Sequence, residues 1–210
     1  MSSRPYELTP ILLAGGGATR FGGLKQLVEL GGKPLIRWPM EAIEELNWTY
    51  DPLLVLGYRA EEIKASIDTS HFRVLENDSW GEGLSSSVKL GVSSVEDGTT
   101  GLLLFLADMP LITPSLITRV IEAREPGSSI VAPAYKEQRG FPVLLDRRWK
   151  RALSTEISGD RGARRLISEN RDELKLVETD WKGVVLDVDE KSDVEEIETY
   201  LKEEGEEIGV

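Results

Sequence analysis

Short apolar runs alternate with segments of helical spacing along this chain of 210 residues. The first run, Thr9 to Leu13, suits a buried strand and leads directly into a glycine-rich loop. Comparable runs follow at Pro52 to Leu56, Phe72 to Leu75, Gly101 to Ala107, Ser129 to Ala132, Pro142 to Leu145 and Val184 to Leu186. Strands that alternate with helices predict an α/β domain around a mainly parallel sheet. In such sheets ligands bind beyond the carboxyl ends of the strands, so the residues that follow each run matter most for function.

Apolar residues recur at helical spacing between these runs. Two such stripes are Leu35, Ile36, Pro39, Met40 and Ile43, and Leu116, Ile117, Val120 and Ile121. Thr113 followed by Pro114 predicts a capped helix start. Ser192 and Glu195 predict a capping box for a last helix, whose inner stripe is Val194, Ile197 and Leu201. No polar linker divides the chain, so we expect one domain over residues 1–210, with its core at about 8–201 and a polar tail at 202–210.

Composition excludes several kinds of catalytic and binding machinery. The chain has no cysteine and a single histidine, His71, which excludes thiol nucleophiles, disulfides and histidine zinc cages. A formal charge of −12 argues against a nucleic-acid partner, although the segment Asp187 to Val210 alone holds 11 acids against 2 bases. No run of 18 apolar residues exists, and Met1 to Glu7 is polar. We therefore expect a cytoplasmic protein without membrane contact.

The loop after the first strand is the strongest chemical signal. It reads Ala14-Gly15-Gly16-Gly17-Ala18-Thr19-Arg20-Phe21-Gly22-Gly23-Leu24-Lys25, with five glycines, two bases and no acid. Glycines allow several backbone N–H groups to approach one anion, which predicts a polyphosphate cradle. A dinucleotide fingerprint would need glycine at Arg20, and a P-loop would need Gly-Lys-Ser/Thr at Gly22 to Leu24. The alternative is a plain strand-to-helix turn with two solvated cations.

Carboxylates follow two of the apolar runs. Asp108 closes the run Gly101 to Ala107, where a buried carboxylate needs a cation or backbone donors, and a magnesium ligand is the natural role. The alternative is a turn cap before Pro110. Asp187 and Asp189 lie two apart after Val184 to Leu186, which places both on one face if that run is a strand. One of them would complete a metal site with Asp108, although a solvated strand end accounts for them equally well.

Two further polar segments are candidates for ligand binding. The segment Asn77 to Ser87 leads into a helix with serines and glycines, which suits phosphate or ribose binding as well as ordinary capping. The segment Gly159 to Arg165 holds three arginines, which suit an anionic ligand or a solvated helix face. His71 is expected at the surface.

Taken in order, these motifs resemble those of the Rossmann-like nucleotidyltransferases that act on the molybdenum cofactor. The matching strings are Leu13-Ala14-Gly15-Gly16, Arg20 to Lys25, Gly31 to Leu35, Asn77 with Trp80, Gly83 and Ser85, Asp108-Met109-Pro110, Arg139 to Pro142, Gly159 to Arg164 and Asp187-Val188-Asp189. The resemblance spans about residues 9–200. It implies a three-layer α/β/α fold of the nucleotide-diphospho-sugar transferase type, with a mainly parallel sheet.

Within that group the chain is most similar to the cytidylyltransferases, because Arg20, Gly22 and Lys25 have the spacing of their loop and Gly159 to Arg164 matches their later motif. Two residues depart from that pattern. Gly15 stands where the cytidylyl enzymes usually have alanine and the guanylyl enzymes glycine. Phe141 stands where an arginine-glycine-histidine-proline motif has its histidine.

The resemblance implies transfer of CMP from CTP to the phosphate of molybdopterin or the molybdenum cofactor, with release of pyrophosphate. It assigns Arg20 and Lys25 to the triphosphate, and Leu13, Ala14, Gly15, Gly16 and Gly17 to the nucleotide. It assigns Asp108 and Asp189 to Mg²⁺, with Asp187 as the other candidate, and Asn77, Ser85, Arg139 and Phe141 to the pterin. The alternatives are GTP as the nucleotide, a sugar or polyol phosphate as the acceptor, and a non-catalytic binding protein that hands cofactor to a client molybdoenzyme.

Overall fold

The computed structural model describes residues 5–17 and 21–208, with residues 202–208 described by their backbone alone. One sheet runs through the centre of the molecule in the order β10-β7-β9-β6-β1-β4-β5, and β8 pairs with β7 at one end. In chain order these strands are β1 (Leu8–Ala14), β4 (Leu53–Leu56), β5 (Arg73–Glu76), β6 (Gly101–Leu106), β7 (Ile130–Tyr135), β8 (Gln138–Arg139), β9 (Val143–Asp146) and β10 (Leu174–Glu178). A separate hairpin joins β2 (Glu29–Leu30) to β3 (Lys33–Pro34).

The sheet is parallel except at β8 and β9. Strand β1 lies at its centre and pairs in parallel with β4 and β6, so that Ile11 lies opposite both Leu53 and Leu104. Strand β9 runs antiparallel between β6 and β7. The carboxyl ends of β1, β4, β5 and β6 therefore meet at one edge of the sheet, which is where ligands bind in such folds.

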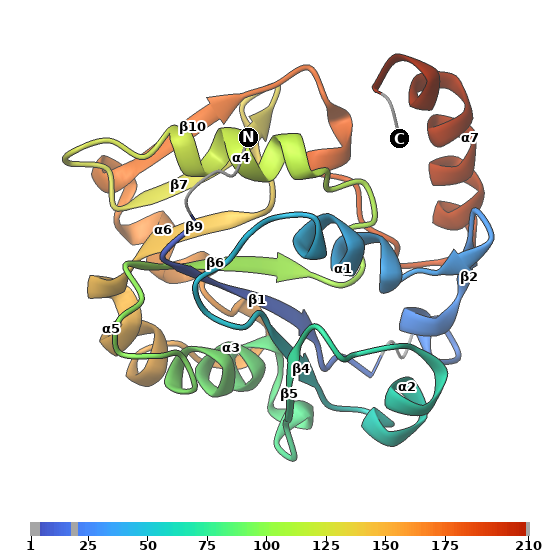
Figure 1. The fold of residues 1–210 in the computed structure, drawn as a ribbon, viewed down its shortest axis with the longest axis horizontal. Helices are drawn as coiled ribbons and strands as arrows, with labels where there is room; N and C mark the ends of the chain where they lie inside the picture. Colours follow the sequence, from blue (N-terminus) through green and yellow to red (C-terminus); the bar gives the residue numbers. More distant parts are fainter. Residues whose placement is uncertain (1–4, 18–20, 209–210) are drawn as a thin grey trace.

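Helices cover both faces of the sheet. They are α1 (Arg37–Glu44), α2 (Ala60–Ser66), α3 (Leu84–Ser93), α4 (Pro114–Glu122), α5 (Lys150–Thr155), α6 (Arg164–Glu169) and α7 (Lys191–Ile208). Short 3-10 turns are η1 (Lys25–Leu27), η2 (Trp80–Glu82), η3 (Arg147–Trp149), η4 (Gly159–Arg161), η5 (Arg171–Glu173) and η6 (Lys182–Val184). Figure 1 shows α3 and α5 on the side of the sheet opposite α1 and α4.

The alternation of side chains along β1 divides the core into two layers. Leu12 points into the cluster built with α1, α2 and α4, whereas Ile11 and Leu13 point into the cluster built with α3, α5 and α6. A third, smaller cluster joins the hairpin β2–β3 to α7 through residues such as Leu30 and Ile197. This three-layer arrangement confirms the expected α/β/α fold.

Helix starts are partly as the sequence predicted. Thr113 caps α4, because its Oγ1 accepts a hydrogen bond from the Leu116 N–H at 3.3 Å, and Pro114 follows at the first helical position. The capping box at Ser192 is wrong: α7 already begins at Lys191, and the carboxylate of Asp193 accepts from the N–H groups of Asp189 and Glu190, each at 2.7 Å. A carboxylate that reaches back to these donors takes the role expected of Glu195.

The expected strand at Val184 to Leu186 is also wrong. Val184 ends the turn η6, and its carbonyl oxygen accepts from the Phe141 N–H at 3.0 Å. The edge position beside β7 is instead occupied by β10, in a segment where charged residues interrupt the apolar pattern. Val184 is fully buried and belongs to the core cluster that contains residues of α1, α2 and α4. Among the described residues, no helix is long and apolar enough to cross a membrane.

Candidate active site

A cavity of about 470 Å³ opens at the carboxyl ends of β1 and β6. It contains much of the predicted nucleotide and metal site, although these residues lie far apart in the sequence. Its lining includes Leu13, Ala14, Gly15, Gly16, Lys25, Gln26, Asp108, Asp187 and Asp189, together with Asp160 and Arg164. Arg20, the second predicted cation of the loop, lies outside the described residues, whereas Gly17 is described but does not line the cavity.

The glycine loop is tied to the following turn by Gln26. The Gln26 side chain is buried, and its Nε2 donates to the carbonyl oxygens of Ala14 at 2.9 Å and Gly16 at 3.0 Å. These two bonds hold the loop directly against the start of η1, which carries Lys25. Gln26 was not predicted from the sequence, because a polar residue next to a lysine in a turn gives no sign of burial.

Close contacts with a side chain and with backbone explain two of the glycines around the loop. A Cβ atom on Gly15 would lie 2.7 Å from the Ser87 Oγ, and one on Gly57 would lie 2.6 Å from the Gly15 carbonyl oxygen. The side chain of Trp80 lies beside Gly17 in the same way, at 3.0 Å from the place of a Cβ. The loop is therefore fitted between α3, the end of β4 and an indole ring.

Lys25 is shared between two carboxylates. Its Nζ donates to Asp108 Oδ2 at 2.8 Å and to Asp189 Oδ1 at 3.2 Å, and its side chain is only 12% exposed. Burial acts to lower the pKa of Lys25, but the carboxylates of Asp108 and Asp189 outweigh it and raise the pKa above its ordinary value. Lys25 therefore stays charged at neutral pH and keeps its ammonium group inside the cavity.

Three carboxylates converge beside this lysine. Oxygen atoms of Asp108, Asp187 and Asp189 all lie within 4.8 Å of one another. Asp108 Oδ1 is buried and has no hydrogen-bond partner among the described residues. Desolvation raises the pKa of Asp187, and the charges of Asp108 and Asp189 raise it further. Such oxygen donors suit a hard divalent cation such as Mg²⁺ or Mn²⁺, which would satisfy the unpartnered oxygen and relieve the repulsion.

The C-terminal segment brings two of these carboxylates to the site without forming a strand. The N–H of Val188 donates to the Asp108 carbonyl oxygen at 2.9 Å, and the Val188 side chain is fully buried. Asp187 and Asp189 flank this anchored valine. The structure thus brings Asp108 together with both aspartates through this anchored loop, and not through the strand periodicity from which the sequence predicted one of them beside Asp108.

Two residues predicted for the second substrate lie beside the cavity rather than on it. Asn77 is 6% exposed, and its Nδ2 donates to Ser86 Oγ at 2.8 Å and to Ser87 Oγ at 2.9 Å. Its Oδ1 accepts from the Ser79 N–H at 3.0 Å. Ser85 is buried in the first turn of α3. The Asn77 amide thus joins the end of β5 to the start of α3.

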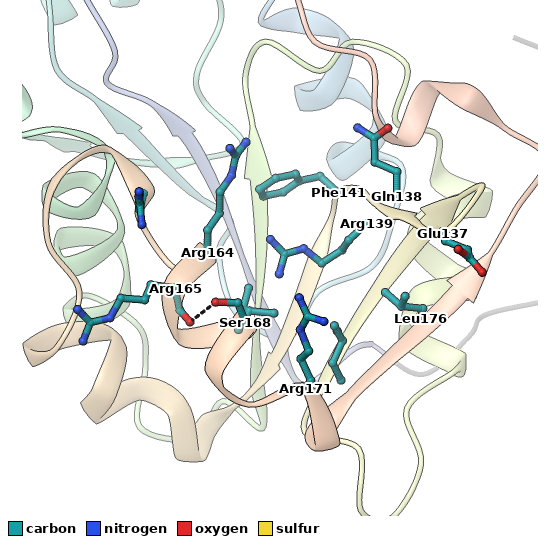
Figure 2. A pocket seen from close by; sticks show the side chains of 12 residues that line it. Glu137, Gln138, Arg139, Phe141, Arg164, Arg165, Ser168, Arg171 and Leu176 are labelled. Carbon is teal, nitrogen blue, oxygen red and sulfur yellow. Dashed lines mark hydrogen bonds between the residues drawn. The ribbon is translucent and has the colours of Figure 1, made fainter.

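Arg139 and Phe141, the other two residues predicted for the second substrate, line a second cavity of about 810 Å³ (Figure 2). Burial lowers the pKa of Arg139, and the positive charge of Arg164 lowers it further. Arg164 lines both cavities, so the two are neighbours. This arrangement can hold two anionic ligands side by side.

The site lies at the carboxyl edge of a parallel sheet and combines a glycine loop with a lysine and three carboxylates. This is the arrangement of an α/β domain suited to binding a polyphosphate. Comparison with known protein families identifies which family of such domains the chain belongs to. The family model described as MobA-like NTP transferase domain matches residues 10–174, and the chain belongs to that family. The resemblance noted from the motifs is thus confirmed.

Two curated relatives cover nearly the whole chain. Nicotine blue oxidoreductase of Paenarthrobacter nicotinovorans is 26% identical over 200 residues, which cover 91% of this chain and 92% of that protein. The probable molybdenum cofactor guanylyltransferase of Pyrococcus furiosus is 25% identical over 207 residues, which cover 91% of this chain and 97% of that protein.

Solved structures share the fold. The Mycobacterium tuberculosis Rv0371c homologue from Mycobacterium sp. strain JC1 has a TM-score of 0.84 at 26% identity, covering 95% of this chain and 99% of that one. Rv0371c of M. tuberculosis H37Rv in complex with manganese has a TM-score of 0.77 at 23% identity, covering 91% of this chain and 98% of that one.

Proposed function

We propose that this protein transfers the CMP group of CTP to the terminal phosphate of molybdopterin or the molybdenum cofactor and releases pyrophosphate. Membership of the NTP transferase family supports nucleotidyl transfer. The name of the P. furiosus relative supports an acceptor related to the molybdenum cofactor. The observation that carries the proposal is the meeting of Lys25 with Asp108, Asp187 and Asp189 beside the glycine loop in one cavity.

In the proposed reaction, an oxygen of the acceptor phosphate attacks the α-phosphorus of the triphosphate. A new P–O bond forms, and the bond from the α-phosphorus to the bridging oxygen breaks as pyrophosphate leaves. Both reactants are anions, so the protein's task is to neutralise charge and to align the two groups. No side-chain nucleophile is needed, which suits a chain without cysteine.

We assign the triphosphate to the glycine loop and its bases. Backbone N–H groups from Ala14 to Gly17 would bind phosphate oxygens, with Leu13 at the nucleotide end. Lys25 would supply positive charge from inside the cavity, and Arg20 would supply a second cation. Gln26 supports this assignment, because its two hydrogen bonds keep the loop and the lysine in a fixed relation.

Asp108, Asp189 and Asp187 would hold Mg²⁺. When bound, the metal supplies a Lewis acid that withdraws charge from phosphate oxygens. Its fit is supported by the unpartnered oxygen of Asp108 and by the short separation of the three carboxylates. Manganese in the complex of Rv0371c, which shares this fold, is consistent with a divalent ion.

The choice between CTP and GTP depends mainly on the residues of the glycine loop. The spacing of Arg20, Gly22 and Lys25 supports CTP, whereas glycine at position 15 and the name of the P. furiosus relative support GTP as the second candidate. On the acceptor side we propose Arg139 and Phe141 as contacts, with Ser85, which is buried in α3, as a further candidate. For Asn77 the internal bonds of its amide favour a positioning role at the start of α3.

The test is pyrophosphate release with each of the four nucleoside triphosphates, Mg²⁺ and molybdopterin. We expect release with CTP that depends on the acceptor. Release with GTP alone would refute the cytidylyl assignment, and a failure to release pyrophosphate from any of the four would favour a non-catalytic binding protein.

A further inference from the structure

The larger cavity is lined by arginines from separate segments of the chain. Arg139 comes from β8, Arg161 from η4, Arg164 and Arg165 from α6, and Arg171 from η5. Among the described residues that line the cavity, Glu137 is the single acid. We call this space the arginine cavity. These five positive charges lie in a protein whose formal charge is −12.

Most of these guanidinium groups lack partners within the described part of the chain. Arg165 pairs with Glu169 Oε1 at 3.1 Å, but the side chains of the other four make no ion pair or hydrogen bond there. Several arginines outside the cavity are paired: Arg37 with Glu44 at 3.1 Å, Arg124 with Asp146, and Arg148 with Glu173. Acids are available throughout the chain, yet few are placed here.

Two of these charges, Arg139 and Arg171, converge on one space, whereas the exposed side chain of Arg165 points away from it (Figure 2). Figure 2 shows the side chains of Arg139 and Arg171 reaching toward each other, with Arg164 and Phe141 close by. Uncompensated like charges repel, and the lowered pKa of Arg139 reflects both its burial and the charge of Arg164. A bound anion would remove this repulsion and accept several charge-assisted hydrogen bonds.

The size and lining of the cavity indicate a small molecule. A volume of about 810 Å³ lies within the range of ligand pockets, roughly 300–1,000 Å³. Phe141 and Leu176 add apolar surface, which would pack against the ring or carbon skeleton of a ligand. Because Arg164 also lines the nucleotide cavity, a ligand in the arginine cavity lies next to the bound triphosphate.

We propose that the arginine cavity binds a second anionic group of the acceptor, distinct from the phosphate that reacts. The acceptor class is then a phosphorylated small molecule that carries a ring system and a further anionic group. This assignment rests on the proposed function, which supplies the reacting phosphate. It extends that function by giving Arg161, Arg164 and Arg171 a role in acceptor binding.

The first experiment tests the anion site without the reaction. Inorganic phosphate is titrated by calorimetry into Arg139→Gln/Arg171→Gln and into the matched control Arg147→Gln/Arg151→Gln, whose arginines lie outside the cavity and are exposed. Both variants lose two charges, and the glycine loop is the same in each. We expect phosphate affinity to be at least about tenfold lower in the cavity variant. Equal affinity in the two variants overturns the proposal.

The second experiment tests the identity of the ligand. Binding of molybdopterin and of CTP is measured for the same variants by equilibrium dialysis. We expect molybdopterin affinity to fall at least about tenfold in the cavity variant while CTP affinity matches the control. Unchanged molybdopterin affinity beside weakened phosphate binding overturns the acceptor assignment. Failure of the proposed function is a separate outcome. In that case the wild-type protein would release no pyrophosphate but would still bind phosphate in the arginine cavity.

Discussion

Replacing Lys25 by methionine should make the metal-free protein less stable and its response to Mg²⁺ stronger. Lys25 donates to Asp108 at 2.8 Å and to Asp189 at 3.2 Å, and the two carboxylates are 26% and 55% exposed. Removing the ammonium leaves three carboxylates within 4.8 Å of one another without a cation. Loss of a fully buried pair costs about 3–5 kcal/mol and of an exposed pair about 0–1 kcal/mol, so this partly buried pair should contribute about 2 kcal/mol.

For a chain of this size, about 2 kcal/mol corresponds to a Tm lower by about 4–8 °C. Thermal unfolding with and without saturating Mg²⁺ measures both effects. Mg²⁺ should raise the Tm of Lys25→Met more than that of the wild type, because in the wild type the ammonium already neutralises the carboxylates and must yield them to the metal.

Lys64→Met is the matched control. Lys64 also bridges two carboxylates, Glu61 at 2.7 Å and Glu76 at 2.6 Å, but on the open surface. Its loss should change the Tm little and leave the Mg²⁺ response as in the wild type. A Mg²⁺-induced shift in Lys25→Met equal to or smaller than that of the wild type would refute the reasoning, because the lysine and the metal would then not share the carboxylates.

Four other substitutions probe the metal cluster, the packing and the acceptor side. Asp108→Asn should lower turnover in the pyrophosphate-release assay about 100-fold, as expected for loss of a charge partner in the transition state, and wild-type turnover would remove Asp108 from the mechanism. Asp187→Asn should raise the Tm of the metal-free protein at neutral pH. Folding raises the pKa of the Asp187 carboxyl, so the wild-type protein loses stability as pH rises from the ordinary pKa of this group through its folded pKa. The increase in Tm that the substitution causes should therefore vanish below the ordinary pKa. Gly140→Ala should destabilise by about 1–3 kcal/mol in urea unfolding, because a Cβ there would overlap the Val184 carbonyl, whereas Gly81→Ala, which meets open space, should be neutral. Phe141→His should change the dissociation constant of molybdopterin more than that of CTP, and equal changes in both would contradict its place on the acceptor side.

Most of the sheet could be predicted because its strands are buried on both faces. Continuous apolar runs such as Leu102 to Phe105 favour a central strand over a loop or a surface helix, and a carboxylate at the end of such a run, here Asp108, is conspicuous. Edge elements lack this signal. Strand β10 is partly exposed and carries Lys175 and Glu178, so its sequence does not differ from that of a loop.

Within the candidate site, the sequence predicted only those residues whose type alone indicates a chemical role. Lys25 and the aspartates stood out because charges beside apolar runs are costly without partners. Gln26 acts through hydrogen bonds to backbone carbonyls, and the arrangement of Asp187 and Asp189 depends on the anchoring of Val188. The role of Gln26 and the position of the two aspartates both depend on tertiary contacts, which cannot be predicted from a single sequence.

The wide sequence separation within the carboxylate cluster has a consequence for folding. Lys25 meets Asp108 across 83 positions and Asp189 across 164. Closing such long loops is entropically costly, so these contacts should form after the local elements around β1 and α1. During synthesis, the segment with Asp187 and Asp189 leaves the ribosome well after β1, Lys25 and Asp108. A nascent chain would therefore complete its glycine loop long before its carboxylate cluster, and metal binding would report that this later segment has docked against Asp108.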